Sequence, residues 1–395
     1  MGNNNYQRII PLLMVFLLLN SIPIDIYLPA VKSIAIDLST SVVSLQLGIY
    51  LYMISKGVGQ LLLGPLSDKY GRRPIALFSL TIYTIASFIA VVSINLEMLM
   101  ASRFFQGFGA CGCAITALAI VRDNYNKSEC ARIYSILSGV QSLVPAIIPL
   151  IGSLIVINFG WRYCFLFLML ISIITIIFSI NIIPRVNISI SKVVTNQSML
   201  SIIINRKFLP YALASVSATA FIVQYAVNSP VILIDIMRLT PVEFSQVFGF
   251  NALLIIFFSY WATRVIRKYS PEVACNIGLV FLALMSVLFF FNPTPNNLTT
   301  YIVVTSLGSA GFSFCLGSST GLALSPFSKC AGKASAVIGF LQCVLSSFAG
   351  FVFGLFFSEG AQSMSITVFL FAFLSVMTSL LFRKWTNKRI QISST

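Results

Sequence analysis

Three ionisable side chains stand inside long apolar stretches of the sequence, where charged residues are rare. They are Asp25, Lys56 and Arg103. A charge at the centre of a bilayer costs about 2.5–3.5 kcal/mol or more, so such a residue usually faces a partner or a water-filled cavity and often has a function. Because the sequence contains no histidine, a proton relay through these stretches would have to use carboxyl groups. We therefore expect Asp25 to bind a proton, with Arg103 at a similar depth as the charge that adjusts it.

The protonation of Asp25 would depend on its surroundings. Apolar surroundings favour the neutral carboxyl group, whereas a nearby guanidinium favours the carboxylate. If two conformations place Arg103 at different distances from Asp25, the carboxyl group would gain a proton in one and lose it in the other. The alternative is a static ion pair between Asp25 and Arg103 that orients two helices.

Lys56 shares one predicted helix face with Tyr52 and Gln60, which lie one turn before and after it. One interpretation is that Lys56 contacts a substrate that carries a carboxylate or is zwitterionic. The alternative is that Lys56 neutralises Asp25 or hydrogen-bonds to backbone carbonyl groups. Polar residues that could line a substrate cavity, each of which could instead join two helices by a hydrogen bond, are Asn20, Tyr52, Lys56, Gln60, Gln106, Gln224, Asn228 and Gln342.

Membrane-spanning helices must carry these residues. The chain is 58% hydrophobic and only 9% charged, whereas soluble domains average about 25% charged residues. Runs of about 20 apolar residues recur along it, each long enough to cross the hydrocarbon core as a helix. The sequence thus predicts an all-α integral membrane protein. Its twelve expected spans are 8–30, 42–66, 74–94, 97–121, 132–158, 162–184, 207–229, 243–265, 272–291, 298–322, 334–357 and 361–382.

The basic residues predict the orientation of the chain. Most of the 25 lysines and arginines fall at the two termini or in the loops that follow even-numbered spans. The opposite side keeps only Lys32, Arg162 and Arg238. By the positive-inside rule, both termini are expected in the cytoplasm. The net charge of +15 then reflects membrane topology, and no nucleic-acid partner is expected.

The longest predicted loop divides the chain into two halves of six spans each. The predicted organisation is an N-terminal half over 1–184, a cytoplasmic linker over 185–207 and a C-terminal half over 208–395. Paired halves of this kind are typical of secondary transporters, whose substrate path lies near the midplane between the repeats.

The sequence lacks the motifs of ATP-driven or catalytic proteins. No G-x-x-x-x-G-K-[ST] phosphate loop and no H-E-x-x-H metal motif is present. We therefore expect neither an enzyme nor a cofactor, and transport driven by an ion gradient. One proton that crosses 100 mV releases about 2.3 kcal/mol. The eight scattered cysteines are expected to pack as small apolar residues, and no metal site is expected.

A charged stretch, "GPLSDKYGRRP" (64–74), is expected to form the short cytoplasmic turn between the second and third spans. Gly64 would let two helices approach closely, and Pro65 and Pro74 would lie at helix ends. Asp68 would accept hydrogen bonds from a helix N-terminus and pair with Arg72. Such a cluster would hold one conformation closed on the inner side; the alternative is a plain basic turn. The residues of this predicted latch are Gly64, Asp68, Gly71, Arg72 and Arg73.

Three motifs resemble those of the major facilitator superfamily. Gly64-x-Leu66-x-Asp68-x-x-Gly71-Arg72-Arg73 resembles its signature loop, and Arg103-Phe-Phe-Gln106-Gly107 resembles its fourth-span motif, whose arginine is associated with proton coupling. "GVQSLVPAIIPLIGS" (139–153) resembles its antiporter motif, with Ser142, Val144 and Ser153 where glycine often stands. The matching residues of this helix are Gly139, Pro145, Pro149 and Gly152.

Longer fragments are similar to the Bcr/CflA drug-resistance branch of that superfamily. They are "DIYLPA" (25–30), "GQLLLGPLSDKYGRRP" (59–74), "LTPVEFSQVFGFNAL" (239–253) and "AGKASAVIGFLQ" (331–342). The resemblance implies a proton antiporter of the bacterial inner membrane that expels drugs such as bicyclomycin, chloramphenicol or sulfonamides. It also implies that the acid of span 1 and the arginine of span 4 in that branch correspond to Asp25 and Arg103. We also expect the protein to be a monomer.

The leading hypothesis is a proton-coupled exporter of small amphipathic compounds that works by alternating access. A second hypothesis keeps the same machinery but moves a carboxylate-bearing metabolite or siderophore, outward or inward. A third hypothesis, a channel or a receptor without transport activity, is disfavoured because nothing in the sequence resembles a selectivity filter.

Overall fold

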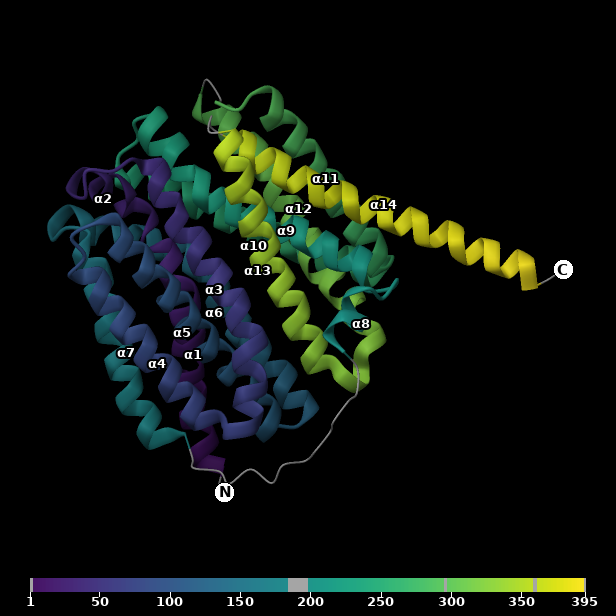
Figure 1. The fold of residues 1–395 in the computed structure, drawn as a ribbon, viewed down its shortest axis with the longest axis horizontal. Coiled ribbons are helices and arrows are strands. Elements are labelled where there is room, and N and C mark those ends of the chain that lie inside the picture. The colour runs from purple at the N-terminus through teal and green to yellow at the C-terminus, as the bar shows by residue number, and fades with distance from the viewer. Residues whose placement is uncertain (1–2, 184–197, 295–296, 358–360, 394–395) are drawn as a thin grey trace. The chain divides into compact units, whose positions relative to one another are not determined.

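The computed structural model describes residues 3–183, 198–294, 297–357 and 361–393. Within these ranges the chain forms only helices and their connections (Figure 1). Twelve of the helical segments are long and apolar enough to cross a membrane, which confirms the predicted fold class. Residues 184–197, which hold most of the predicted linker, lie outside the described residues.

The first seven helices, with one short helical turn, occupy the N-terminal part of the chain (Figure 1). Their bounds are α1 Asn3–Asp25, η1 Leu28–Ala30, α2 Val31–Asp37, α3 Val42–Tyr70, α4 Arg72–Val91, α5 Leu96–Asn124, α6 Lys127–Asn158 and α7 Arg162–Ile182. The first span is therefore longer than predicted, because η1 and α2 continue it to Asp37.

The remaining elements begin with α8, which lies within the predicted linker, and continue through the C-terminal part of the chain. Their bounds are α8 Met199–Ile203, α9 Leu209–Ser229, the π-helix η2 Pro230–Ile236, α10 Pro241–Lys268, α11 Pro271–Phe291, α12 Leu298–Leu324, η3 Ser325–Cys330, α13 Ala331–Phe356 and α14 Gln362–Ser393. The seventh span is extended beyond its predicted end by η2.

Polar caps explain where several spans begin. The side chain of Asn95 accepts a hydrogen bond from the backbone N–H of Met98 at 2.9 Å. Asn297 does the same for Thr300 at 2.8 Å. Asn126 and Glu129 form a reciprocal capping box at the start of α6. Each cap satisfies a backbone donor that the first helical turn leaves free, so the apolar runs become helices with defined starts.

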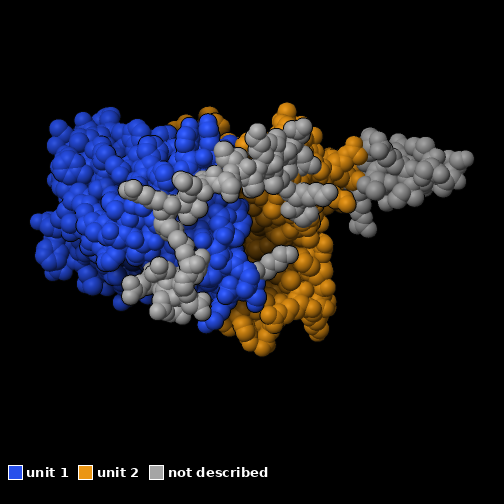
Figure 2. Space-filling view, turned by 90° about the horizontal axis from the view of Figure 1, so that it is seen from below, with its two compact units in different colours: residues 1–192, 226–253 blue, residues 193–225, 254–395 orange. Residues whose placement is uncertain are grey.

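Contacts group the chain into two compact units, coloured separately in Figure 2. Unit 1 contains residues 1–192 and 226–253, and unit 2 contains residues 193–225 and 254–395. The second segment of unit 1 packs on α3 and α6. The Gln46 side chain donates to the Val227 carbonyl at 3.2 Å, and the Ser245 hydroxyl donates to the Pro149 carbonyl at 2.8 Å.

Helix α5 is the centre of unit 1 because small residues let its neighbours come very close. A Cβ atom at Gly107 would lie 2.3 Å from the carbonyl oxygen of Tyr52 on α3. One at Gly109 would lie 2.6 Å from the carbonyl oxygen of Ser79 on α4. In lipid, where apolar burial does not drive helices together, such backbone contacts are a main source of association. They fix the position of Arg103, which α5 carries.

Candidate functional site

Arg103 is fully enclosed in unit 1, with 0% of the residue exposed. One terminal nitrogen donates to the Gln106 side-chain oxygen at 2.5 Å, and the other donates to the Pro23 backbone carbonyl at 3.0 Å. Gln106 in turn donates to the Ser87 hydroxyl at 2.9 Å. This chain of hydrogen bonds joins α1, α4 and α5 around a buried charge.

Aromatic rings surround the same guanidinium. Its central carbon lies 4.8 Å from the ring centroid of Tyr27, 5.0 Å from that of Tyr52 and 5.8 Å from that of Phe165. The Tyr27 hydroxyl donates to the Leu45 carbonyl at 3.0 Å and the Tyr52 hydroxyl to the Asn20 carbonyl at 2.8 Å, so both rings are held in place. Ring faces attract a cation, and here they replace part of its hydration.

Asp25 ends α1, and the residue is only 7% exposed. In the part of the chain that the structure describes, its carboxyl group makes neither an ion pair within 4.0 Å nor a hydrogen bond. The alternative of a static ion pair between Asp25 and Arg103 is therefore wrong in this structure. The guanidinium instead holds the Pro23 carbonyl, two residues before Asp25. Arg103 thus positions the backbone that carries the acid, and the acid itself has no direct partner among the described residues.

Lys56 and Gln60 are half-buried on α3. Among the described residues neither side chain has a hydrogen bond, and Lys56 has no carboxylate within 4.0 Å. The predictions that Lys56 pairs with Asp25 or bonds to backbone carbonyls are therefore not met. By contrast, Asn20, Tyr52 and Gln106 all belong to the enclosed cluster around Arg103.

The predicted polar residues of the second half fall into both units. Gln224 is fully buried on α9, where its amide donates to the Ser346 carbonyl of α13 at 3.4 Å. A Cβ at Gly350 would lie 1.6 Å from that amide nitrogen, so Gln224 occupies the space that this glycine leaves. Gln342 donates to the Thr320 hydroxyl at 3.3 Å. Gln224 thus joins two helices, which is the alternative that the sequence left open, and Asn228 belongs to unit 1 and is buried.

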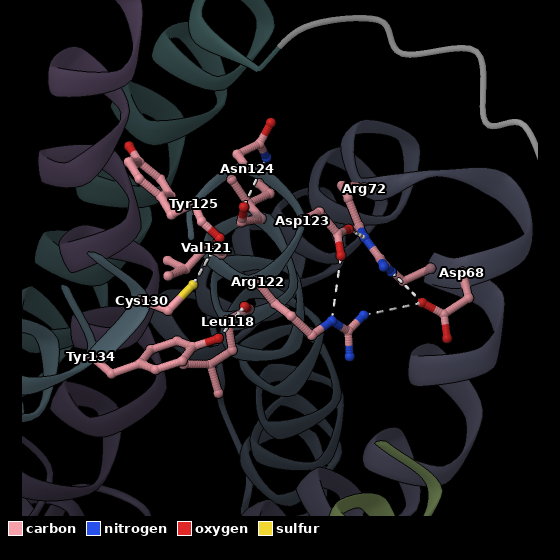
Figure 3. A network of polar contacts seen from close by, with 12 residues as sticks. Asp68, Arg72, Leu118, Val121, Arg122, Asp123, Asn124, Tyr125, Cys130 and Tyr134 are labelled. Atoms are coloured by element: carbon pink, nitrogen blue, oxygen red, sulfur yellow. Dashed lines mark hydrogen bonds and ion pairs between the residues drawn. The ribbon is translucent and has the colours of Figure 1, made fainter. Parts of the chain in front are cut away.

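The predicted inner latch contains a network of ion pairs (Figure 3). Arg72 donates to Asp68 at 2.6 Å, to Ser67 at 3.0 Å and to Asp123 at 2.8 Å. Arg122 completes the network, 3.3 Å from Asp123 and 3.8 Å from Asp68. The predicted Asp68–Arg72 pair is confirmed, and α3, α4 and α5 meet at it. We call Asp68, Arg72, Arg122 and Asp123 the inner cluster.

Gly71 is the single residue between α3 and α4. Its φ is 101° and its ψ is 159°, and its N–H donates to the Ser67 carbonyl. This positive φ is one that side chains with a Cβ rarely adopt, so the turn requires glycine. It aims Arg72 back at α3, and Arg73 donates to the Ile180 carbonyl of α7 at 2.7 Å.

Three details of the predicted turn are wrong. Pro65 lies inside α3, which continues to Tyr70, whereas Pro74 does lie in the first turn of α4. A Cβ at Gly64 would meet nothing within 4 Å, so no helix of the described chain approaches closely there. Asp68 accepts from the Arg72 side chain at 2.6 Å, and no bond to a helix N-terminus is seen in the described chain, because the charged side chain is the stronger donor.

The antiporter-motif residues lie along α6. A Cβ at Gly152 would be 2.9 Å from the Ile26 carbonyl oxygen, so this glycine permits close packing on the break after α1. The Pro149 carbonyl accepts the Ser245 hydroxyl, and Pro145 is half-buried one turn earlier. A Cβ at Gly139 would meet no atom of the described chain within 4 Å.

Two groups of contacts were not predicted. At the loops that precede α3, α5 and α7, Arg162 donates to Asp37 at 2.5 Å and to the Ser93 carbonyl at 2.9 Å, and Trp161 donates to Asp37 at 3.1 Å. The sequence signal was the presence of an acid and a cation near the same predicted outer boundary.

The second group of contacts that was not predicted is the ring of Tyr27 beside Arg103. The sequence offered no signal for it beyond the "DIYLPA" fragment.

Comparison with known proteins adds to this geometry. The family model described as Major Facilitator Superfamily matches residues 13–351. The multidrug resistance protein MdtL of Escherichia coli O81 (strain ED1a) is 28% identical over 329 residues, covering 82% of each chain, and that of Shigella flexneri serotype 5b (strain 8401) gives the same figures.

Solved structures show the same fold at lower identity. A bacterial homolog of the human lysosomal transporter Spinster, in an inward-facing and unoccupied conformation, has a TM-score of 0.75 at 15% identity, covering 97% of this chain and 99% of that one. An occupied inward-facing form has a TM-score of 0.74 at 14% identity, covering 97% and 98%.

Proposed function

This chain belongs to the Major Facilitator Superfamily and is a multi-pass membrane transporter. We propose that it is a drug/proton antiporter that exports small amphipathic compounds by alternating access. The relatives named multidrug resistance proteins support this over a metabolite or siderophore transporter. The observation that carries the proton coupling is Asp25, a buried acid without a partner in the described chain, on a helix end held by Arg103.

The enclosed guanidinium defines how coupling would work. Arg103 is held by hydrogen bonds, aromatic rings and close helix packing, so its charge stays with α5. Asp25 is the last residue of α1 and directly precedes the break in span 1 that leads to η1. A change at this break would alter the distance and the solvent between carboxyl group and guanidinium. The neutral acid is favoured when the two are apart in apolar surroundings, and the carboxylate when they are close or wet.

The inner cluster would act as the latch between conformations. Its four charges join the inner ends of α3, α4 and α5. Exposed ion pairs are individually weak, about 0–1 kcal/mol each, so such a network can form and break within a transport cycle. Gly71 sets its geometry.

We also propose the remaining features that the basic residues and the family favour. The protein would lie in the bacterial inner membrane as a monomer with both termini in the cytoplasm. No cofactor would be needed, because the proton gradient would drive export. Substrate would contact polar residues on open helix faces, with Lys56 and Gln60 as the first candidates.

The test is drug transport in proteoliposomes under an imposed pH gradient. We expect Asp25→Asn to abolish uphill transport driven by that gradient, because the amide cannot exchange a proton. Glu97→Gln is the matched control, since Glu97 is an exposed acid on α5, and it should transport normally. Uphill transport by Asp25→Asn at the wild-type rate would show that this acid does not couple the proton.

A further inference from the structure

Helix α3 has one face that packs on α5. A Cβ at Gly107 of α5 would lie within 2.3 Å of both the Tyr52 carbonyl oxygen and the Ser55 hydroxyl. A Cβ at Gly59 would lie 3.1 Å from Cys111. Residues of α3 on this packed face recur every three or four positions, as expected for a helix: Gly48, Tyr52, Ser55, Gly59 and Leu63.

The adjoining face of α3 changes character along its length. In its outer part, Ile49 and Met53 are buried, and the Gln46 side chain is bonded to the Val227 carbonyl. In its inner part, Lys56 and Gln60 are only half-buried. One turn further, a Cβ at Gly64 would meet nothing within 4 Å. Lys56 therefore stands where a closed helix face becomes an open one.

The side of α3 opposite Gln60 is apolar. Leu62 is 51% exposed, and at about 100° per residue it lies about 120° around the helix from Lys56 and about 160° from Gln60. An apolar side chain exposed in a membrane span is suited to lipid. Lys56 and Gln60 thus lie on the side of α3 turned away from this lipid-suited surface.

No acid on the described chain neutralises Lys56. It has no carboxylate within 4.0 Å and no hydrogen bond there. Helix rise separates Asp25 from Lys56 along the axes of α1 and α3. The Tyr52 hydroxyl reaches the Asn20 carbonyl, and Asp25 is five residues outward of Asn20 while Lys56 is four residues inward of Tyr52. At 1.5 Å per residue, this spacing amounts to about 14 Å.

An ammonium group within a span needs an anion or water to offset the loss of hydration. We infer that Lys56 binds the acidic group of those transported compounds that carry one, so the substrate range includes amphipathic organic anions such as aromatic carboxylates or sulfonates. Gln60, one turn inward on the same face, offers a neutral hydrogen-bond donor beside it. This inference rests on the proposed export function and specifies its substrate class.

The test compares two compounds that share the same apolar part. Chloramphenicol is neutral, and its succinate ester carries a carboxylate. Counterflow in proteoliposomes at equal pH measures binding and exchange of each without any proton gradient. We expect Lys56→Gln to raise the half-saturating concentration of the succinate ester at least tenfold and to leave that of chloramphenicol within twofold. Lys56→Arg, which keeps the charge, should retain most of the ester's exchange.

The control is Lys268→Gln, which removes an exposed lysine at the end of α10. It should leave the half-saturating concentrations of both compounds unchanged. An equal loss for both compounds, or no loss for either, in Lys56→Gln would overturn the inference. Proton coupling is read separately, from Asp25→Asn under a pH gradient in the same vesicles. If Asp25→Asn still transported uphill at the wild-type rate under the pH gradient, the antiporter proposal would be refuted. The charge preference measured by counterflow would stand independently of that result.

Discussion

Two cations of unit 1, Arg103 on α5 and Lys56 on α3, are treated in opposite ways by the fold. Arg103 is 0% exposed, with three aromatic rings, a side-chain amide and a backbone carbonyl around it. Lys56 is half-buried and makes neither an ion pair nor a hydrogen bond among the described residues. The difference separates two kinds of charge inside a span: Arg103 has protein partners that join helices, whereas Lys56 is the charge that we propose to meet a ligand.

The largest effect is expected from Arg103→Ala. It would leave the Pro23 carbonyl and the Gln106 oxygen without their donor, and each buried group left unsatisfied costs about 1–3 kcal/mol. We expect a large fall in melting temperature in detergent and loss of both gradient-driven transport and counterflow. Arg103→Lys should restore little, since one ammonium cannot reproduce the planar fork of donors. Wild-type stability in Arg103→Ala would refute the positioning role.

A packing test contrasts the two faces of α3. Gly107→Ala places a Cβ 2.3 Å from a backbone oxygen of α3, so the helices must separate, at a cost of about 1–3 kcal/mol. Gly64→Ala is the matched control, because its Cβ would meet nothing within 4 Å. We expect thermal melting to show a clear loss for the first and none for the second. Equal losses would contradict the open inner face of α3.

The inner cluster offers a third cation, which is neutralised by acids. Arg72 has 19% of its side chain exposed and bonds to Asp68 and Asp123, whereas Arg122 is 56% exposed and more distant from both. We expect Arg72→Ala to slow transport several-fold with little change in melting temperature, and Arg122→Ala to have a smaller effect. Transport rates in proteoliposomes measure both. A larger defect in Arg122→Ala would reverse the assigned order.

The smallest effect is expected from Tyr52→Phe. The ring would stay over the guanidinium while the hydrogen bond to the Asn20 carbonyl is lost, at about 0.5–1.5 kcal/mol. We expect a slightly lower melting temperature and near-normal transport of chloramphenicol. Loss of that transport would place the Tyr52 hydroxyl in the substrate path, and would weaken the contrast between an enclosed Arg103 and an open Lys56.

Much of the fold followed from the sequence, because lipid leaves few choices. Apolar runs of about 20 residues predicted all twelve spans, and the 64–74 motif predicted the Asp68–Arg72 pair that the structure confirms. Membership of the superfamily was also confirmed, while the finer Bcr/CflA assignment stays a prediction. Where helices begin and end was less certain: Pro65 proved to be internal to α3, because a membrane-spanning helix tolerates an internal proline when neighbouring groups or local backbone adjustments satisfy the carbonyl that it frees.

The partners of the intramembrane charges could not be read in the same way. Depth alone suggested that Asp25 and Arg103 meet, but depth fixes height and leaves the direction of each side chain open. The structure directs the guanidinium to the Pro23 carbonyl and to aromatic rings. Those contacts depend on how closely α5 packs on α3 and α4.

The sequence by itself determined that this is a twelve-span helical membrane protein with three charges inside its spans, because hydrophobicity and helix length are local properties that any bilayer enforces. Only the tertiary structure decided which of those charges has partners within the described protein. Glycines of α5 bring neighbouring helices into backbone contact, and this packing encloses Arg103 completely while leaving Lys56 on an open face.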